Sequence, residues 1–362
     1  MNGAQWLVSK LREIGEEYVF ALCGNGLDPF LKACHEFGMK VIDVRNEQSA
    51  SYMADLWGRM TRKMGVVAVS SGPGHTNALT GLANAFWDGG PMMLISGCSS
   101  QDTRGLDNFQ EIDQVGMAAP VCKYASMIRH VTTLPYEVES AIANAVSGRP
   151  GPVHLTIPVD IFNAEVNESK LRKKLPSIEV NPMCPGDADL IKSAVKLLAD
   201  AKKPFMVVGS GVFYAQAWNE IKEFASITDI PIVSHIWDRC CIEEVIPQYM
   251  GVTNNELNYS MDKLSEADVV FVVGARIDYR LSCGLPPGFP KESKVIRVDI
   301  EPSEINRALI PDIGIIGDPR SVLKQVIEES LKIDIKSNSC LLYTSDAADD
   351  LLCVDLGGRR II

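Results

Sequence analysis

The sequence has no uninterrupted apolar run of membrane-spanning length, although 46% of its 362 residues are hydrophobic. Its ten cysteines form no Cys-x-x-Cys pair, and only Cys240 and Cys241 are adjacent. It also lacks an excess of basic residues, because 46 Asp and Glu against 35 Lys and Arg give a net charge of -11. These absences argue against a membrane protein, a disulfide scaffold or zinc site, and a nucleic-acid partner. They predict a globular protein of the reducing cytoplasm.

Length and periodicity predict two α/β domains in succession, since 362 residues exceed one ordinary core. Short β-branched runs alternate with helix-like apolar repeats from Ala4 onward, a pattern typical of parallel sheets between two helical layers. We predict one domain over 1–165, a charged and proline-containing linker over 166–183, and a Rossmann-like domain over 184–332. The early start of helical periodicity leaves no room for a signal or transit peptide.

Glu47 is the first candidate for chemistry. It follows the β-branched run Val41 to Val44 and precedes a long helical repeat, which predicts a strand, then Glu47, then a helix. Open α/β sheets bind their ligands at the carboxyl ends of buried parallel strands, so Glu47 is a candidate acid or base. The alternative is an ordinary glutamate at a helix N-terminus, which the helix dipole favours.

Three further motifs follow along the chain. Ser71-Gly72-Pro73-Gly74-His75-Thr76-Asn77 stands between a predicted strand and a predicted helix that Thr76 would cap. It has no Gly-Lys-Ser/Thr, so it is no Walker loop, and an ordinary strand-to-helix turn is the alternative. Asn108-Phe109-Gln110-Glu111 lies in the connection 97–120, whose length is typical of a functional loop. Arg149-Pro150-Gly151-Pro152-Val153 leads rigidly into another strand.

In this order and spacing, Glu47 and the three motifs resemble the N-terminal part of thiamine-diphosphate enzymes of the acetohydroxyacid (acetolactate) synthase type. The resemblance covers the two predicted domains. It implies a thiamine-diphosphate-binding fold followed by the Rossmann-like domain, and a homodimer or tetramer acting on a small 2-keto acid or acyl-CoA. In that family the residue matching Glu47 hydrogen-bonds the pyrimidine ring nitrogen, so that the 4'-amino group can remove the thiazolium C2 proton.

The resemblance also implies roles for residues around the cofactor ring. The loop Gly24-Asn25-Gly26 would approach the ring, and the pyrimidine-side pocket would be formed by Ser71, Gly72, Pro73, Gly74 and Asn77. Gln110 would reach the thiazolium side as a second catalytic residue, while Phe109 and Lys123 would contact substrate. From the residues alone, the alternatives are a tight turn, a surface amide, a buried aromatic and a solvated lysine.

The second domain contains a glycine turn, Gly209-Ser210-Gly211, after a predicted strand. Tyr214 stands where the dinucleotide fingerprint has its third glycine, so a dehydrogenase site has little support. The resemblance implies an adenine nucleotide in this domain, FAD as in acetohydroxyacid synthases or ADP as in some acyl-CoA lyases. Arg276 would lie near its diphosphate and Asp299 near its adenosine.

The end of the sequence departs from the family. The family holds the Mg²⁺ that clamps the cofactor diphosphate with Gly-Asp-Gly and a later Asn-Asn; the first is absent and Asn254-Asn255 has no such motif before it, so no metal ligand is predicted. Residues 333–339 begin an interrupted connection. Cys340 to Asp349 and Val354 to Ile362 match in-frame translations of the two ends of a transposon-type sequencing adapter, rather than a natural acidic tail. We therefore expect a truncated and inactive form of a longer parent.

Two classes of function remain open from the sequence. In the first, the intact parent is an acetolactate synthase-like enzyme that forms or cleaves carbon-carbon bonds next to the carbonyl of a 2-keto acid. Gly284-Leu285-Pro286-Pro287 is closer to 2-hydroxyacyl-CoA lyases, so a lyase or an enzyme like oxalyl-CoA decarboxylase is the alternative. In the second class, the chain as given is a non-catalytic module that at most binds a nucleotide.

Overall fold

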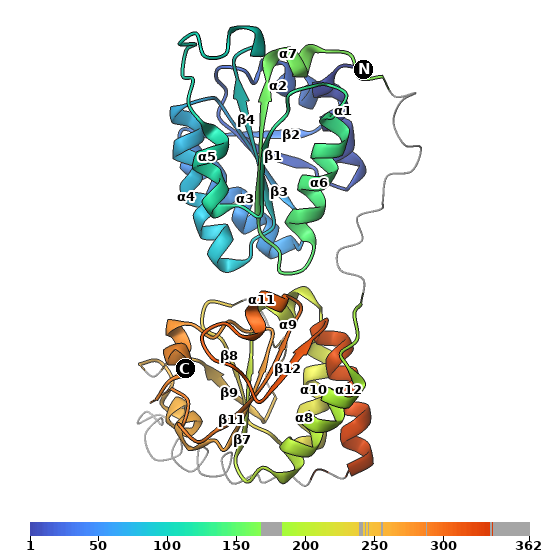
Figure 1. The fold of residues 1–362 in the computed structure, drawn as a ribbon, viewed down its shortest axis with the longest axis vertical. Coiled ribbons are helices and arrows are strands. Elements are labelled where there is room, and N and C mark those ends of the chain that lie inside the picture. The colour runs from blue at the N-terminus through green and yellow to red at the C-terminus, as the bar shows by residue number, and fades with distance from the viewer. Residues whose placement is uncertain are drawn as a thin grey trace, which may run out of the picture. The chain divides into compact units, whose positions relative to one another are not determined.

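The computed structural model describes residues 1–167, 183–238, 242, 244, 246–254, 256–286, 288–333 and 335. The chain divides into two compact units, Met1–Asn181 and Pro182–Ile362, and the division falls inside the predicted linker, of which 168–182 lies outside the described residues. The adapter-like tail 340–362 and most of 333–339 also lie outside them. Each unit is a parallel six-stranded sheet with flanking helices (Figure 1), so the predicted fold class is confirmed.

The sheet of the first unit has the order β2-β1-β3-β4-β6-β5. Its strands are β1 (Tyr18–Ala21), β2 (Lys40–Asp43), β3 (Gly65–Val69), β4 (Met92–Cys98), β5 (Tyr124–Met127) and β6 (Pro152–Pro158). All neighbouring strands pair in parallel, so every carboxyl end lies at one edge. The chain reverses its direction across the sheet between β1 and β3, which is where doubly wound sheets open a crevice for a ligand.

Helices cover both faces of this sheet (Figure 1). One face carries α3 (Glu47–Thr61), α4 (Pro73–Asp88) and α5 (Gln114–Ala118), and the other carries α1 (Gly3–Glu13), α2 (Asp28–Glu36), α6 (Leu134–Val146) and α7 (Val159–Asn163). Each face has its own apolar core, and the central strands β3 and β6 are buried at every residue. Such continuous apolar strands are typical of a parallel sheet covered on both faces.

Three differences between the predicted and the observed elements of the first unit affect the predicted site. β2 is exposed along its whole length because it is an edge strand that pairs only with β1, so the prediction of a buried strand before Glu47 was wrong. β5 was not predicted; it is a short edge strand of partly buried polar and small residues. α4 begins at Pro73 rather than at Thr76, because proline presets the helical φ at the first position, and Thr76 Oγ1 donates to Pro73 O instead of capping.

The second unit has the strand order β12-β11-β10-β7-β8-β9. Its strands are β7 (Pro204–Val208), β8 (Ile232–Ser234), β9 (Tyr249–Val252), β10 (Val269–Val273), β11 (Lys294–Asp299) and β12 (Ile313–Ile316). Its helices are α8 (Ala188–Asp200), α9 (Ser210–Tyr214), α10 (Trp218–Thr228), α11 (Pro302–Ile305) and α12 (Pro319–Ile333). From β7 the chain adds β8 and β9 on one side and then crosses to add β10, β11 and β12 on the other, so the switch point lies beside the turn that follows β7.

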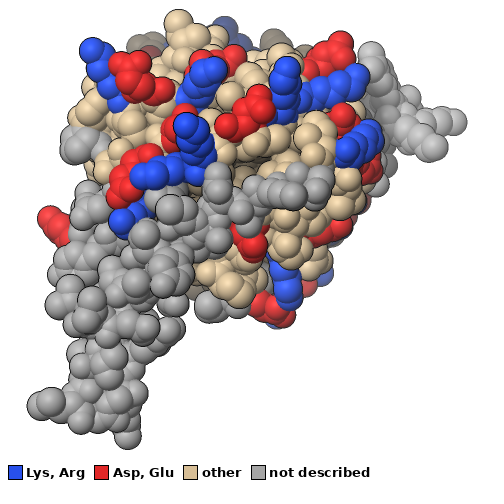
Figure 2. All heavy atoms as spheres, turned by 90° about the horizontal axis from the view of Figure 1, so that it is seen from below, with Lys and Arg blue, Asp and Glu red and all other residues tan. Residues whose placement is uncertain are grey.

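The described surface mixes charges of both signs. On the face drawn in Figure 2, basic and acidic side chains lie interspersed. Several exposed side chains of opposite charge form local pairs, such as Lys203 with Glu266 and Lys332 with Glu329. Exposed pairs of this kind contribute little to stability, because water and salt screen them. Among the described residues, no helix combines the length and the apolar content needed to cross a membrane.

Candidate functional site

The loops that follow β1, β3 and β4 meet at the carboxyl edge of the first sheet. Asn25, in the loop after β1, places its side-chain amide nitrogen 3.1 Å from Ser71 Oγ and 3.4 Å from Ser99 Oγ. The same nitrogen lies 3.3 Å from the carbonyl oxygen of Phe109. One asparagine therefore ties together three loops that are far apart in the sequence.

Gly72 and Gln110 make the closest approach between two of these loops. Gly72 has φ +59°, and a Cβ there would lie 2.8 Å from the Cβ of Gln110, so only glycine fits. Gln110 itself has φ 61°, and its side-chain oxygen lies 3.4 Å from Ser71 Oγ. Gly24 and Gly26 pack in a similar way against Ser70 and the backbone of Cys98. The glycines thus draw the backbones of these three loops into one surface.

Glu47 lies beside this surface as the first residue of α3. Asn46 caps the helix by accepting from the amide of Gln48 at 2.8 Å, which fixes where the Glu47 side chain starts. The Glu47 side chain is 9% exposed, and its Oε2 accepts from the Asn77 amide at 2.9 Å. A Cβ on Gly74 would lie 3.2 Å from Oε1, so that oxygen faces the glycine turn.

The two carboxylate oxygens of Glu47 are therefore in different situations. Asn77 holds Oε2, while Oε1 accepts no hydrogen bond from any described residue. A nearly buried carboxylate with one oxygen fixed and the other available suits a group that shares a proton with a ligand atom. The helix dipole at the start of α3 also stabilises its negative charge.

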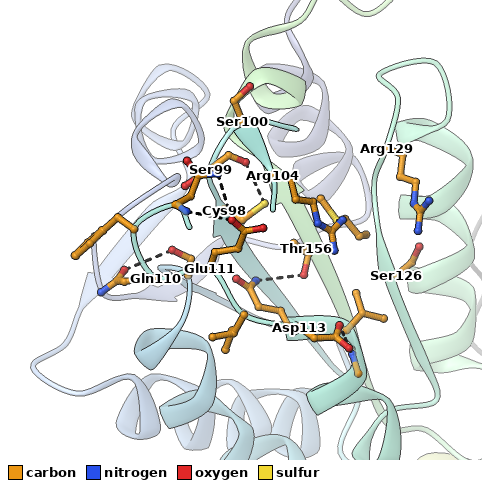
Figure 3. A pocket seen from close by; sticks show the side chains of 18 of the residues that line it. Cys98, Ser99, Ser100, Arg104, Gln110, Glu111, Asp113, Ser126, Arg129 and Thr156 are labelled. Carbon is orange, nitrogen blue, oxygen red and sulfur yellow. Dashed lines mark hydrogen bonds between the residues drawn. The ribbon is translucent and has the colours of Figure 1, made fainter. Parts of the chain in front are cut away.

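A cavity of about 420 Å³ opens beside the loop that contains Gln110 (Figure 3). Its wall is formed by the end of β4, the loop that contains Gln110, and residues of β5 and β6. Glu111 lines it with a carboxylate that accepts from the amides of Gly105 and Asn108, bonds that hold the pKa of Glu111 below its ordinary value. Glu47 does not line this cavity; Ser71 and Gln110 connect the two features.

Two predicted substrate residues lie apart from one another. Phe109 is 73% exposed on the Gln110 loop, so it is not a buried aromatic, which was the alternative to a substrate contact. Lys123 directly precedes β5, at the amino end of the sheet, and its ammonium group donates to the carbonyls of Ser147 and Arg149 at 2.6 and 2.8 Å. The structure therefore brings Phe109 to the edge that carries Glu47 but does not bring Lys123 there.

The sequence analysis missed the serines that join these loops. Ser99 receives the Asn25 amide, and Ser70 packs beneath Gly24 and Gly74. Both serines directly follow a buried apolar strand, at the position where an α/β sheet presents its functional groups. That position was the signal in the sequence that would have identified them.

A buried histidine pair also escaped the sequence analysis. Ser96 Oγ lies 2.8 Å from His75 Nδ1 and 3.2 Å from His154 Nε2, and the two rings are 4.7 Å apart. Both histidines are fully buried, and burial lowers the pKa of His75 to about 4 and that of His154 further below its ordinary value. The neutral pair links the first turn of α4, which carries Gly74 and Asn77, to β4 and β6.

We expect this pair to make the protein acid-sensitive. A histidine with a lowered folded pKa takes up its proton in the unfolded chain first, so its contribution is complete above pH 6.5 and is lost as pH falls toward 4. Urea unfolding of the wild type should show a loss of about 2 to 3 kcal/mol from His75 alone between pH 7 and pH 4.5. His75→Asn should remove that difference, and His35→Asn, at an exposed position, should not. Equal acid loss in all three proteins would contradict the assignment.

Two family models match this chain in succession. The N-terminal TPP-binding domain of thiamine pyrophosphate enzymes matches residues 1–117, and the central domain of the same enzymes matches 191–326. The chain belongs to the thiamine pyrophosphate enzyme family. The predicted membership of the thiamine-diphosphate enzymes is confirmed. The loops after β1, β3 and β4 that surround Glu47 lie within the first matched region.

Curated relatives of this thiamine pyrophosphate enzyme chain carry acetolactate synthase names. A probable acetolactate synthase large subunit from Methanococcus aeolicus is 35% identical over 335 residues, which are 91% of this chain and 55% of that protein. The acetolactate synthase isozyme 3 large subunit of Escherichia coli K12 is 34% identical, over 91% of this chain and 58% of that protein. The acetolactate synthase large subunit of Haemophilus influenzae is 35% identical, over 92% of this chain and 59% of that protein. The chain spans under two thirds of the length of these relatives.

The family implies thiamine diphosphate as the cofactor. The edge of the sheet that carries Glu47 fits the ring half of this cofactor. A flat ring needs a surface with little side-chain bulk and a carboxylate at its rim, and the glycine loops with Glu47 Oε1 provide both. The diphosphate half needs a cation with oxygen ligands. No group of three or more His, Cys, Asp or Glu suited to a metal occurs among the described residues.

The second unit of this family member does not fit a nucleotide diphosphate in the same way. Arg276 Nη2 lies 3.3 Å from Glu304 Oε1, so its charge is neutralised within the unit. Asp299 accepts from the amide of Glu301 at 2.9 Å and is 7% exposed. A Cβ on Gly209 would lie 2.5 Å from the Cα of Ala275, so this glycine allows two turns of the chain to pack against each other.

Proposed function

We propose that the parent of this chain is an acetolactate synthase-like enzyme dependent on thiamine diphosphate and Mg²⁺, which forms or cleaves carbon-carbon bonds next to the carbonyl of 2-keto acids. The observation that carries the proposal is Glu47, with Oε2 held by Asn77 and Oε1 open toward the glycine turn. The acetolactate synthase names of the relatives favour this reaction over an acyl-CoA lyase or a nucleotide-binding module.

In this proposal the first unit supplies the pyrimidine side of the cofactor site. Gly24, Gly72 and Gly74 let the loops that would border the flat ring pack closely together, Asn25 and Ser71 hold those loops, and Glu47 Oε1 holds or moves a proton at the ring nitrogen. Asn77 orients that carboxylate. When bound, the cofactor supplies a carbon nucleophile next to the substrate carbonyl. Gln110 and Phe109 border the side from which the substrate would arrive.

Thiamine without its diphosphate tests the ring surface directly. On titration into the isotope-labelled 362-residue chain, we expect amide NMR shifts at Gly72, Gly74, Asn77 and Gln110, with affinity in the millimolar range of a fragment. Glu47→Gln should weaken binding by about 10- to 100-fold, because a hydrogen bond to a charged group is lost.

The matched control is Glu17→Gln, which changes an exposed glutamate at the opposite edge of the same sheet. It should leave thiamine binding unchanged. Shifts confined to the second unit, or equal weakening by both substitutions, would contradict the proposed ring site.

We also propose that a second copy of this chain covers α3. The outer face of that helix carries Tyr52, Met53, Leu56 and Met60, each more than 40% exposed, while its inner face buries small and polar residues such as Ala50, Ser51 and Asp55. A surface helix of a monomer has the reverse pattern. The stripe begins little more than one turn after Glu47, so a partner bound there would border the ring site.

Sedimentation tests this contact. We expect the wild-type chain to show a monomer-dimer equilibrium, and Leu56→Glu to shift it to monomer because a charge cannot be buried unpaired. Leu331→Glu, at a 64% exposed leucine on α12, should leave the equilibrium as in the wild type. A wild type that stays monomeric at high concentration, or equal effects of both substitutions, would contradict the proposed contact.

A further inference from the structure

A cluster of charged side chains lies at the carboxyl ends of β7, β8 and β10 in the second unit. It consists of His235 and Asp238 after β8, and Asp278 and Arg280 after β10. His235 is fully buried, and the side chains of Asp238 and Arg280 are 12% and 9% exposed. This is the switch point of the sheet, where a ligand of an open α/β domain binds.

Asp238 occupies the centre of this cluster. Its Oδ2 accepts from the backbone amide of Ser210 at 2.7 Å, and its Oδ1 lies 3.1 Å from Arg280 Nη1. The His235 ring is 3.6 Å away. Burial alone would raise the pKa of Asp238, but its contacts with His235 and Arg280 outweigh burial and hold that pKa below the ordinary value. The carboxylate is therefore ionised at neutral pH.

Arg280 has its donors occupied within the unit. Its Nε and Nη2 bind the carboxylate of Asp278 at 2.8 to 3.2 Å, and its Nη1 binds Asp238 and the carbonyl of Ile236 at 2.9 Å. A guanidinium whose donors are engaged in this way can bind a new anion only by giving up one of its present partners. An arriving phosphate would also meet the two negative charges of Asp238 and Asp278.

The glycine turn beside the cluster is closed by the chain itself. A Cβ on Gly211 would lie 2.7 Å from the Cα of Gly274, so the turn after β7 is packed against the turn after β10. Its Ser210 amide, the kind of donor that binds phosphate at such turns, already donates to Asp238. Among the described residues of this edge, the Ser210 amide and the Arg280 guanidinium are thus already engaged, and the two turns pack directly against each other.

We propose that Asp238 is a built-in substitute for the phosphate of a nucleotide, and that the central unit of this chain holds its ligand edge together without FAD or ADP. The carboxylate satisfies the turn amide and the arginine as a phosphate oxygen would. Removing it should leave a gap that matches a small free carboxylate.

Binding to the purified 362-residue chain tests whether the central unit holds together without FAD or ADP. We expect no bound flavin after purification, and no heat on titration of FAD or ADP to about 1 mM, a concentration that would saturate any physiological site. Saturable binding of either nucleotide would overturn the proposal.

Chemical rescue tests whether the Asp238 carboxylate takes the place of a phosphate. Asp238→Ala should lower the melting temperature by about 5 to 15 °C, because it removes the acceptor of the Ser210 amide and one of the two carboxylates that neutralise the buried Arg280. Added acetate or formate should restore part of that loss saturably. Asp189→Ala, at a 91% exposed aspartate on α8, should show neither effect. A loss without any rescue would overturn the role of the carboxylate as a ligand substitute.

Asp238→Asn keeps the test decisive if the alanine variant does not fold. It retains an acceptor for Ser210 but not the charge for Arg280, so we expect an intermediate melting temperature, no response to acetate and no FAD or ADP binding. Melting equal to the wild type would overturn the proposal.

Discussion

Glu47→Gln in a full-length parent should slow exchange of the cofactor's C2 proton by about two to four orders of magnitude, the usual range for a general acid or base. Glutamine keeps the shape of the side chain and its contact with Asn77. Its amide is not an acid and cannot pass a proton to the ring nitrogen, so proton transfer fails, while the diphosphate contacts of the full-length protein keep the cofactor bound although the ring contact is weakened. Deuterium exchange at C2, followed by NMR after rapid quenching, measures this step without any substrate.

Asn77→Ala is the companion variant, because Asn77 orients the carboxylate without facing the ring. We expect a smaller loss, about 10-fold, since one hydrogen bond to a charged group is removed. Asn77→Asp would place a second carboxylate within 2.9 Å of Glu47 Oε2 and should shift the pH profile of exchange. Exchange as fast in Glu47→Gln as in the unaltered enzyme would contradict the role of Glu47.

Much of the fold followed from local sequence patterns. β3 and β6 are continuous apolar runs that a two-sided parallel sheet requires, and glycine and proline mark their ends. β5 was missed because Tyr124–Met127 is short, partly polar and at an edge, so no periodicity distinguishes it from a loop. β2 contains Val41 and Ile42 yet is exposed, because strand order, which local pattern does not encode, puts it at the edge.

The site was predictable only as far as its motifs are local. The Ser71 to Asn77 turn, the Gln110 loop and Glu47 are short segments with characteristic residues, and their meeting at one edge follows from parallel strands. Whether Lys123 reaches that edge depends on the direction in which β5 runs from it, which was not recognised. The histidine pair depends on the register of β4 against β6, which single-sequence patterns do not specify.

The second unit shows the opposite limit of motif reasoning. Gly209, Gly211 and Arg276 have the residue types and order of a nucleotide site, but the glycines pack against another turn and Arg276 pairs with Glu304. The deciding residue is Asp238, which lies 28 positions beyond Ser210 in the chain. A contact of that sequence separation is fixed by tertiary packing and leaves no local signal.

The second large effect concerns retention of the whole cofactor by this chain. The diphosphate and Mg²⁺ contribute most of the affinity when a protein supplies oxygen ligands for the cation. The printed sequence has no Gly-Asp-Gly, and its net charge of -11 opposes an added polyanion. The ring surface alone provides affinity of fragment strength, about millimolar, which is some three orders of magnitude weaker than a micromolar site.

Equilibrium dialysis of the 362-residue chain against thiamine diphosphate, with and without Mg²⁺, tests most directly whether this chain carries the ring half of the site alone. We predict weak retention that Mg²⁺ does not change, that free thiamine matches, and that Glu47→Gln reduces further. Micromolar retention that depends on Mg²⁺ would contradict the account, and so would the absence of any Glu47-dependent binding of thiamine or its diphosphate.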